Sequence, residues 1–205
     1  MNKFALGAIV FVLGLVGCGS NKTTGPQTTQ PTAPTTTAPV STKGTTTTSS
    51  ALQAEATAAA TGDIPDNQVF LVFKNARAGY SLKYPEGWAQ SGNGNKVTIR
   101  DKNNIVRIEV QPGALPTFAR AKTDLAATQI VSGPAKVTIS GQPAVKVTYS
   151  TESAPNPVTG KRVTLVVDRY YLAHSSKVAI VDLGTGKGVD NVDAYRLMIE
   201  SFRWR

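Results

Sequence analysis

The sequence Tyr80-Ser81-Leu82-Lys83-Tyr84-Pro85-Glu86-Gly87-Trp88 is the clearest structural motif of this 205-residue chain. Its first five residues alternate between large apolar or aromatic side chains and polar ones, which predicts a β-strand with one buried face. Proline and glycine then end the strand, because proline presets the backbone of a turn and glycine tolerates its closing conformation. The tryptophan that follows is a large apolar anchor. The stretch therefore predicts a strand, a tight turn and a return into a core.

Working outward, the same alternation predicts further strands on both sides of this stretch. Most of them are separated by links of hairpin length rich in Asp, Asn, Gly and Pro, which favours antiparallel pairing. We therefore expect an antiparallel sheet. The predicted strands lie at residues 69–73, 80–84, 96–100, 105–110, 135–139, 144–151, 162–173 and 177–183.

Two helices are predicted to flank this sheet. The first begins at Pro116, a favourable first-turn residue, and runs to about Ile130, where Ser132-Gly133-Pro134 stops it. The second lies near the C-terminus. Its apolar side is predicted to consist of Val192, Tyr195, Ile199 and Phe202.

The two ends of this region carry a resemblance to a known family. The Tyr-Pro-x-Gly-Trp sequence at residues 84–88 and the segment 193–202 resemble PsbP-like domains, the photosystem II extrinsic proteins and their bacterial relatives. The resemblance implies an α/β/α sandwich over residues 64–205. Members of this family serve as extrinsic subunits and assembly factors, so the resemblance implies a binding or assembly module. The metal sites of relatives match no residues here, and no cofactor is implied.

The N-terminus predicts where the protein works. Lys3 precedes an apolar run over residues 4–16, which has the length of a signal-peptide core and is short for a membrane span. Leu15-Val16-Gly17-Cys18 resembles the lipobox of bacterial lipoproteins, and Cys18 is the only cysteine. We expect residues 1–17 to be a lipoprotein signal peptide and Cys18 to carry a lipid. An uncleaved anchor and an ordinary secretory signal are the alternatives.

The predicted location follows from this lipid. The protein is expected outside the cytoplasm, anchored to the cell membrane, or to the outer membrane in an organism that has one. Residues 18–63 contain the lipidated cysteine and a segment rich in Thr, Pro, Ala, Ser and Gly. This composition predicts a disordered tether. All six tyrosines and both tryptophans follow Phe70, which places the foldable domain at residues 64–205.

The formal net charge of +9 predicts an anionic partner or a highly soluble surface. Export argues against nucleic acid as a partner, which leaves lipid headgroups, a cell-envelope polymer or an acidic protein patch. The simpler interpretation, which involves no partner, is that exposed lysines keep the sheet soluble and its edges unpaired. The out-facing basic residues that form the candidate surface are Lys83, Lys96, Arg100, Arg107, Lys136 and Lys146.

An alternative function is a carrier or sensor that holds a small amphiphile or glycolipid between the sheet and the helices. Aromatic side chains are predicted to line such a pocket. The candidates are Tyr80, Trp88, Tyr149, Tyr170 and Tyr171.

No catalytic or metal site is predicted. His174 is the only histidine, lies at a predicted strand end and has no cysteine partner, so a solvent-facing turn residue is the better interpretation. The carboxylates near the C-terminus lack calcium-loop spacing. Gly184-Thr185-Gly186-Lys187-Gly188 matches neither a dinucleotide loop nor a P-loop and predicts a plain turn. We therefore expect a non-enzymatic protein.

Overall fold

The computed structural model describes residues 53–54, 57 and 61–205. The predicted signal peptide, Cys18 and nearly all of the predicted tether lie outside the described residues. In chain order the elements are β1 (Phe70–Asn75), β2 (Tyr80–Pro85), β3 (Ala89–Asn93), β4 (Lys96–Asp101), β5 (Asn104–Pro112), α2 (Phe118–Thr123), β6 (Gln129–Ile139), β7 (Gln142–Glu152), β8 (Thr164–His174), β9 (Lys177–Gly186), α3 (Val192–Glu200) and β10 (Arg203–Trp204).

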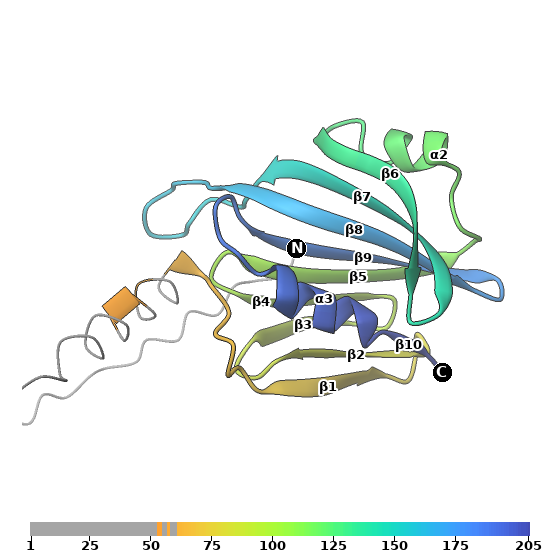
Figure 1. The fold of residues 1–205 in the computed structure, drawn as a ribbon, viewed down its shortest axis with the longest axis horizontal. Coiled ribbons are helices and arrows are strands. Elements are labelled where there is room, and N and C mark those ends of the chain that lie inside the picture. Colours follow the sequence, from red (N-terminus) through yellow and green to blue (C-terminus); the bar gives the residue numbers. More distant parts are fainter. Residues whose placement is uncertain (1–52, 55–56, 58–60) are drawn as a thin grey trace, which may run out of the picture. The chain divides into compact units, whose positions relative to one another are not determined.

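The strands form two antiparallel sheets (Figure 1). The larger has seven strands in the order β3-β4-β5-β9-β8-β7-β6, and the smaller has three in the order β1-β2-β10. The small sheet and α3 cover one face of the large sheet, which we call the first face, and α2 lies against the other, the second face. The predicted fold class, an antiparallel sheet flanked by helices, is confirmed.

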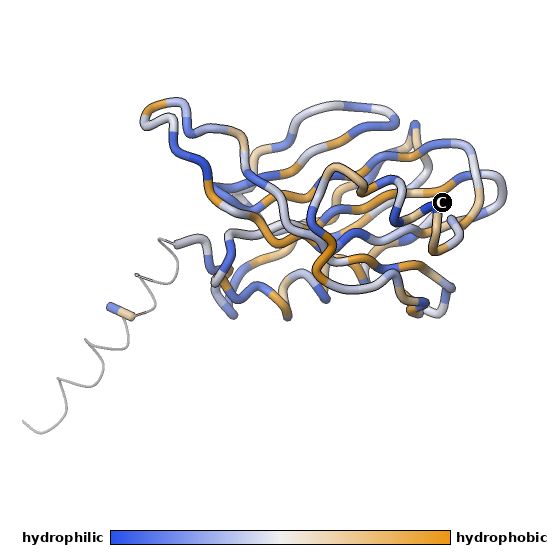
Figure 2. Tube along the Cα trace, turned by 90° about the horizontal axis from the view of Figure 1, so that it is seen from above, coloured by the Kyte–Doolittle hydropathy of each residue, from blue (hydrophilic) through white to orange (hydrophobic). Residues whose placement is uncertain are grey.

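The core of the first face is organised around residues 80–88. Tyr80, Leu82 and Tyr84 point inward from β2, as predicted, and Trp88 is buried beside them. The Tyr80 ring stacks on Phe202 at a centroid distance of 5.5 Å. Such aromatic pairs stabilise a fold by more than the burial of their apolar surface alone. Figure 2 shows apolar and polar residues alternating along the strands, which is how each strand supplies one side to this core.

The core of the second face is smaller because α2 is short. Ala121 and Leu125, from α2 and the turn after it, pack on Val147 and Val167 of the large sheet. This cluster lies over β7, β8 and β9. No described helix covers the second face of β3, β4 and β5, so half of that face is open.

The predicted helix from Pro116 to about Ile130 is wrong beyond its first turns. The helix ends at Thr123, and Gln129 already begins β6, which runs through the predicted stop at residues 132–134. β6 accommodates these residues as an edge strand with two register shifts against β7. A Cβ atom at Gly133 would lie 2.8 Å from the Lys146 carbonyl oxygen, so this close approach requires glycine.

Three other expectations are corrected. The predicted Gly-rich turn after β9 is partly strand, because β9 continues to Gly186. A Cβ atom at Gly184 would lie 2.9 Å from Ile105 Cγ2, so the glycine makes room for the Ile105 side chain of the neighbouring strand. Val192, predicted in the core side of α3, is 70% exposed, and Met198 is fully buried instead. β3 was not predicted as a strand.

Candidate functional site

The open half of the second face carries three of the predicted basic residues. Lys96 and Arg100 alternate along β4 with Val97 and Ile99, which are buried in the first core, so both basic side chains lie on the second face. Arg107 of β5 is paired with Thr98, which shares that face. All three basic residues are exposed. We call Lys96, Arg100 and Arg107 the basic strip.

The other three predicted basic residues lie elsewhere. Lys136 shares the second face but belongs to β6, at the opposite edge of the sheet. Lys146 lies on the first face, where its ammonium group is 2.8 Å from Asp168 and 5.4 Å from the centroid of the Tyr170 ring. Lys83 belongs to β2 of the small sheet. The six residues therefore do not form one surface, and only the strip is continuous.

The strip keeps most of its positive charge. Lys96 forms an exposed ion pair with Glu109 at 3.0 Å, an interaction that contributes little in water. Within the described part of the chain, neither Arg100 nor Arg107 forms an ion pair. Two guanidinium groups are therefore available to a partner on the uncovered half-sheet.

A buried ion pair borders the strip. Asp182 of β9 is paired in register with Arg107 on one side and Arg169 on the other. The Arg169 guanidinium donates two hydrogen bonds to its carboxylate, at 2.7 and 2.8 Å, and the Tyr149 hydroxyl donates a third at 3.2 Å. Asp182 is 5% exposed. Since Arg169 and Tyr149 already bind this carboxylate, Arg107 is left exposed and without an ion pair to it.

This environment raises the pKa of Tyr149 to about 12. Burial is the main cause, and the neighbouring Asp182 carboxylate adds to it, while Arg169 and Arg107 act in the opposite direction. The Arg169 guanidinium lies 5.4 Å from the centroid of the Tyr149 ring. A neutral Tyr149 is thus a hydrogen-bond donor over the ordinary pH range and holds Asp182 in place.

The five aromatic residues predicted to line one pocket are divided between the two faces. Tyr80, Trp88 and Tyr170 belong to the core of the first face, whereas Tyr149 and Tyr171 belong to that of the second. Each is at most 9% exposed. Tyr170 lines a cavity of about 350 Å³ between β8, β9 and α3. The five residues share no pocket, so the carrier alternative loses the site on which it rested.

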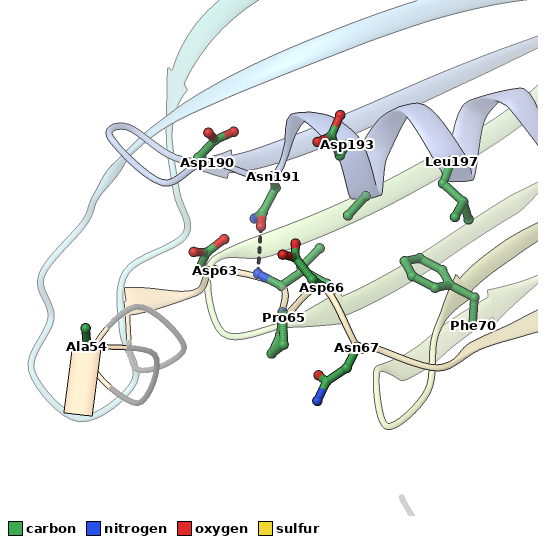
Figure 3. A pocket seen from close by; sticks show the side chains of 12 residues that line it. Ala54, Asp63, Pro65, Asp66, Asn67, Phe70, Asp190, Asn191, Asp193 and Leu197 are labelled. Atoms are coloured by element: carbon green, nitrogen blue, oxygen red, sulfur yellow. Dashed lines mark hydrogen bonds between the residues drawn. The ribbon is translucent and has the colours of Figure 1, made fainter. Parts of the chain in front are cut away.

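A cavity of about 760 Å³ lies where residues 63–67 meet β1 and α3 (Figure 3). Ile64, Phe70 and Leu197 supply apolar walls. Within residues 61–205, no group of three or more His, Cys, Asp or Glu side chains is arranged to hold a metal ion. The carboxylates that line the cavity are Asp63, Asp66, Asp190 and Asp193.

A buried hydrogen-bond network beside this cavity holds the start of the domain. Asn191 accepts a hydrogen bond from the Ile64 backbone N–H at 2.8 Å, drawn in Figure 3, and donates to the Gly62 carbonyl at 3.1 Å. Asn104 donates to the same carbonyl, and Thr185 donates to Asn104 at 2.7 Å. Asn104 and Asn191 are nearly inaccessible to solvent. We call Asn104, Thr185 and Asn191 the asparagine clamp.

His174 is exposed at the end of β8, as predicted, and its ring stacks on Trp204 at 6.0 Å. A search of the described residues finds no helix of the length and apolarity needed to cross a membrane.

No protein-family model matches the sequence, and no curated protein is similar to it. Solved structures do resemble it. The solution structure of cyanobacterial PsbP (CyanoP) from Synechocystis sp. PCC 6803 has 14% identity and a TM-score of 0.49, over 70% of this chain and 98% of that chain. A Bacteroides thetaiotaomicron protein has 13% identity and a TM-score of 0.46, over 65% and 48% of the two chains.

A third similar structure is LpqN, a protein involved in cell envelope biogenesis of Mycobacterium tuberculosis. It has 14% identity and a TM-score of 0.37, over 67% of this chain and 84% of LpqN. The similar structures thus include a member of the family that the Tyr-Pro-x-Gly-Trp stretch resembles.

Proposed function

We propose that this chain is a non-enzymatic, extracytoplasmic binding module that is anchored to a membrane through a lipid on Cys18 and holds an anionic partner on its basic strip. The observation that carries the binding role is the position of Arg100 and Arg107, exposed and without ion pairs on a half-sheet that no described helix covers. The lipobox-like Leu15-Val16-Gly17-Cys18 supports the anchor.

The arrangement of charge favours recognition over mere solubility. Asp182 lies one strand from Arg107, yet its carboxylate is already bound by Arg169. The Asp182 carboxylate therefore lowers the positive electrostatic potential of the basic strip only slightly. A guanidinium group offers a planar fork of donors that matches carboxylate and phosphate oxygens, which a lysine does not. The strip thus fits a partner that presents several such groups along a flat surface.

Binding to anionic probes tests this role. The chain from Gly19 to Arg205 retains every contact described above, and we expect it to bind phosphatidylglycerol vesicles and poly-L-glutamate at low salt. Each basic residue near an anionic surface contributes about 1 kcal/mol, so the double variant Arg100→Gln/Arg107→Gln is expected to bind vesicles about 30-fold more weakly. Binding of the unchanged chain is expected to disappear by a few hundred millimolar salt. Co-sedimentation and titration calorimetry measure both effects.

The matched control is Lys83→Gln/Lys187→Gln, which removes the same charge at exposed positions outside the strip. It is expected to bind nearly as well as the unchanged chain. An equal loss in both double variants would show that net charge, and not the strip, attracts the probes. Binding that persists at high salt would contradict the electrostatic basis of the proposal.

The anchor is tested separately, in cells that process lipoproteins. Mass spectrometry of the mature protein is expected to find residues 1–17 removed and a diacylglyceryl group on Cys18. Cys18→Ser is expected to move the protein from the membrane fraction to the soluble extracytoplasmic fraction, because a protein without acyl chains has no such anchor. An unmodified Cys18, or cleavage at another position, would rule out this form of attachment.

A further inference from the structure

A cavity of about 570 Å³ lies at the β6–β7 side of the large sheet, whereas the basic strip lies on β4 and β5. It lies between the loop that leads into α2 and the hairpin of β6 and β7, elements that Figure 1 shows side by side. Small-molecule sites usually measure roughly 300–1,000 Å³. The cavity is therefore large enough for a ligand.

The lining of this cavity is mostly apolar. Six of its eight lining residues are apolar, among them Leu115, which is half-buried, and Val145, which is 4% exposed. Phe118 also lines it and remains 42% exposed. An occupant that covers the Phe118 ring gains the free energy of removing apolar surface from water. The lining thus favours an alkyl chain or another apolar group.

The two polar lining residues are Thr117 and Lys136. The Thr117 hydroxyl already accepts a hydrogen bond from the Arg120 backbone N–H at 3.2 Å and caps α2. Lys136 is exposed and forms no ion pair with any residue that the structure describes. The charge that the cavity offers to a ligand is therefore a single ammonium group at the side of an apolar surface.

We propose that this cavity binds a single-chain fatty acid, with the alkyl chain against Leu115, Phe118 and Val145 and the carboxylate at Lys136. Charge complementarity selects the carboxylate. The mostly apolar lining favours an alkyl chain over a peptide, whose backbone N–H and C=O groups lose free energy when they leave water without hydrogen-bond partners. This site is independent of the basic strip and does not rest on the proposed function.

A reversal of charge at Lys136 tests the proposal. The chain from Gly19 to Arg205 is titrated with the fluorescent fatty acid cis-parinaric acid, and palmitate and hexadecylamine are then used as competitors. In the unchanged chain, palmitate is expected to displace the probe and hexadecylamine to compete at least tenfold more weakly. In Lys136→Glu, palmitate is expected to lose about tenfold or more in affinity, and hexadecylamine is expected to become the better competitor.

Two further variants separate the site from its alternatives. Lys187→Glu makes the same charge change at an exposed residue outside the cavity and is expected to leave both competitors unaffected. Phe118→Ser removes apolar contact without changing charge and is expected to weaken palmitate and hexadecylamine alike. Circular dichroism confirms that each variant is folded. No binding of cis-parinaric acid to the unchanged chain, or equal affinities of palmitate for the unchanged chain and Lys136→Glu, would overturn the proposal.

Discussion

Asp182→Ala is expected to lower the free energy of unfolding by about 3–5 kcal/mol, because it leaves the Arg169 guanidinium in the interior without its counter-charge. The side chains of Arg169 and Asp182 are 17% and 7% exposed, so water replaces the lost carboxylate only in part. The substitution also removes the acceptor of the Tyr149 hydroxyl. Urea unfolding of the chain from Gly19 to Arg205, followed by tryptophan fluorescence, measures the change.

Removal of both charges is expected to be milder than removal of one. In Arg169→Met/Asp182→Leu no buried charge is left unpaired, and apolar side chains of similar size replace the pair. Asp193→Ala is the control on the surface: its carboxylate pairs with Arg196 but is 84% exposed, so the loss should be below about 1 kcal/mol. A cost for Asp182→Ala no larger than that of Asp193→Ala would show that the buried pair does not stabilise the sheet.

Asn191→Ala is expected to cost about 2 kcal/mol and to loosen the segment that precedes β1. The side chain of Asn191 accepts from the Ile64 backbone N–H and donates to the Gly62 carbonyl. Its removal leaves the part-buried Ile64 N–H without an acceptor and the Gly62 carbonyl with the Asn104 hydrogen bond alone. Hydrogen exchange at residues 61–68 is the direct measurement, since local opening there raises the exchange rate before the domain unfolds.

Asp190→Ala serves as the matched control for the clamp. Asp190 is the residue next to Asn191 and is exposed. Its carboxylate accepts a hydrogen bond from the Val192 backbone N–H at 3.3 Å. Its effect on exchange at residues 61–68 is expected to be small. Unchanged exchange in Asn191→Ala would mean that the start of the domain is held by its apolar contacts and not by the clamp.

Much of the sheet is predictable from local sequence, because apolar and polar residues alternate along any strand that has one face on a core and the other in solvent. The pattern Tyr80-Ser81-Leu82-Lys83-Tyr84 is such a case, and β4, β5, β7, β8 and β9 were also predicted close to their observed bounds. The first helix was overextended for the opposite reason. Apolar residues at helical spacing around Ala121 and Leu125 belong to one short helix and its turn, and pairing with β7 then draws Gln129 into β6.

The candidate sites depend on long-range geometry and were only partly predictable. Alternation correctly places Lys96, Arg100 and Arg107 outward, but whether two outward residues share a face depends on register and sheet order, which separates Lys146 from the strip. The clamp had no sequence signal, since Asn104 and Asn191 are 87 residues apart and neither belongs to a motif.

The asparagine clamp also determines how the domain would bear mechanical tension. A pull on the chain ahead of residue 61 reaches Gly62 and Ile64 before it reaches β1, the outer strand of the small sheet. Without the clamp, such a load would open the β1–β2 hydrogen bonds one after another from the strand end. The clamp instead passes the load to β5, β9 and the start of α3 through several bonds that are stretched together. A load on the N-terminal side of the domain would thus act on the clamp before it acts on the β1–β2 hydrogen bonds.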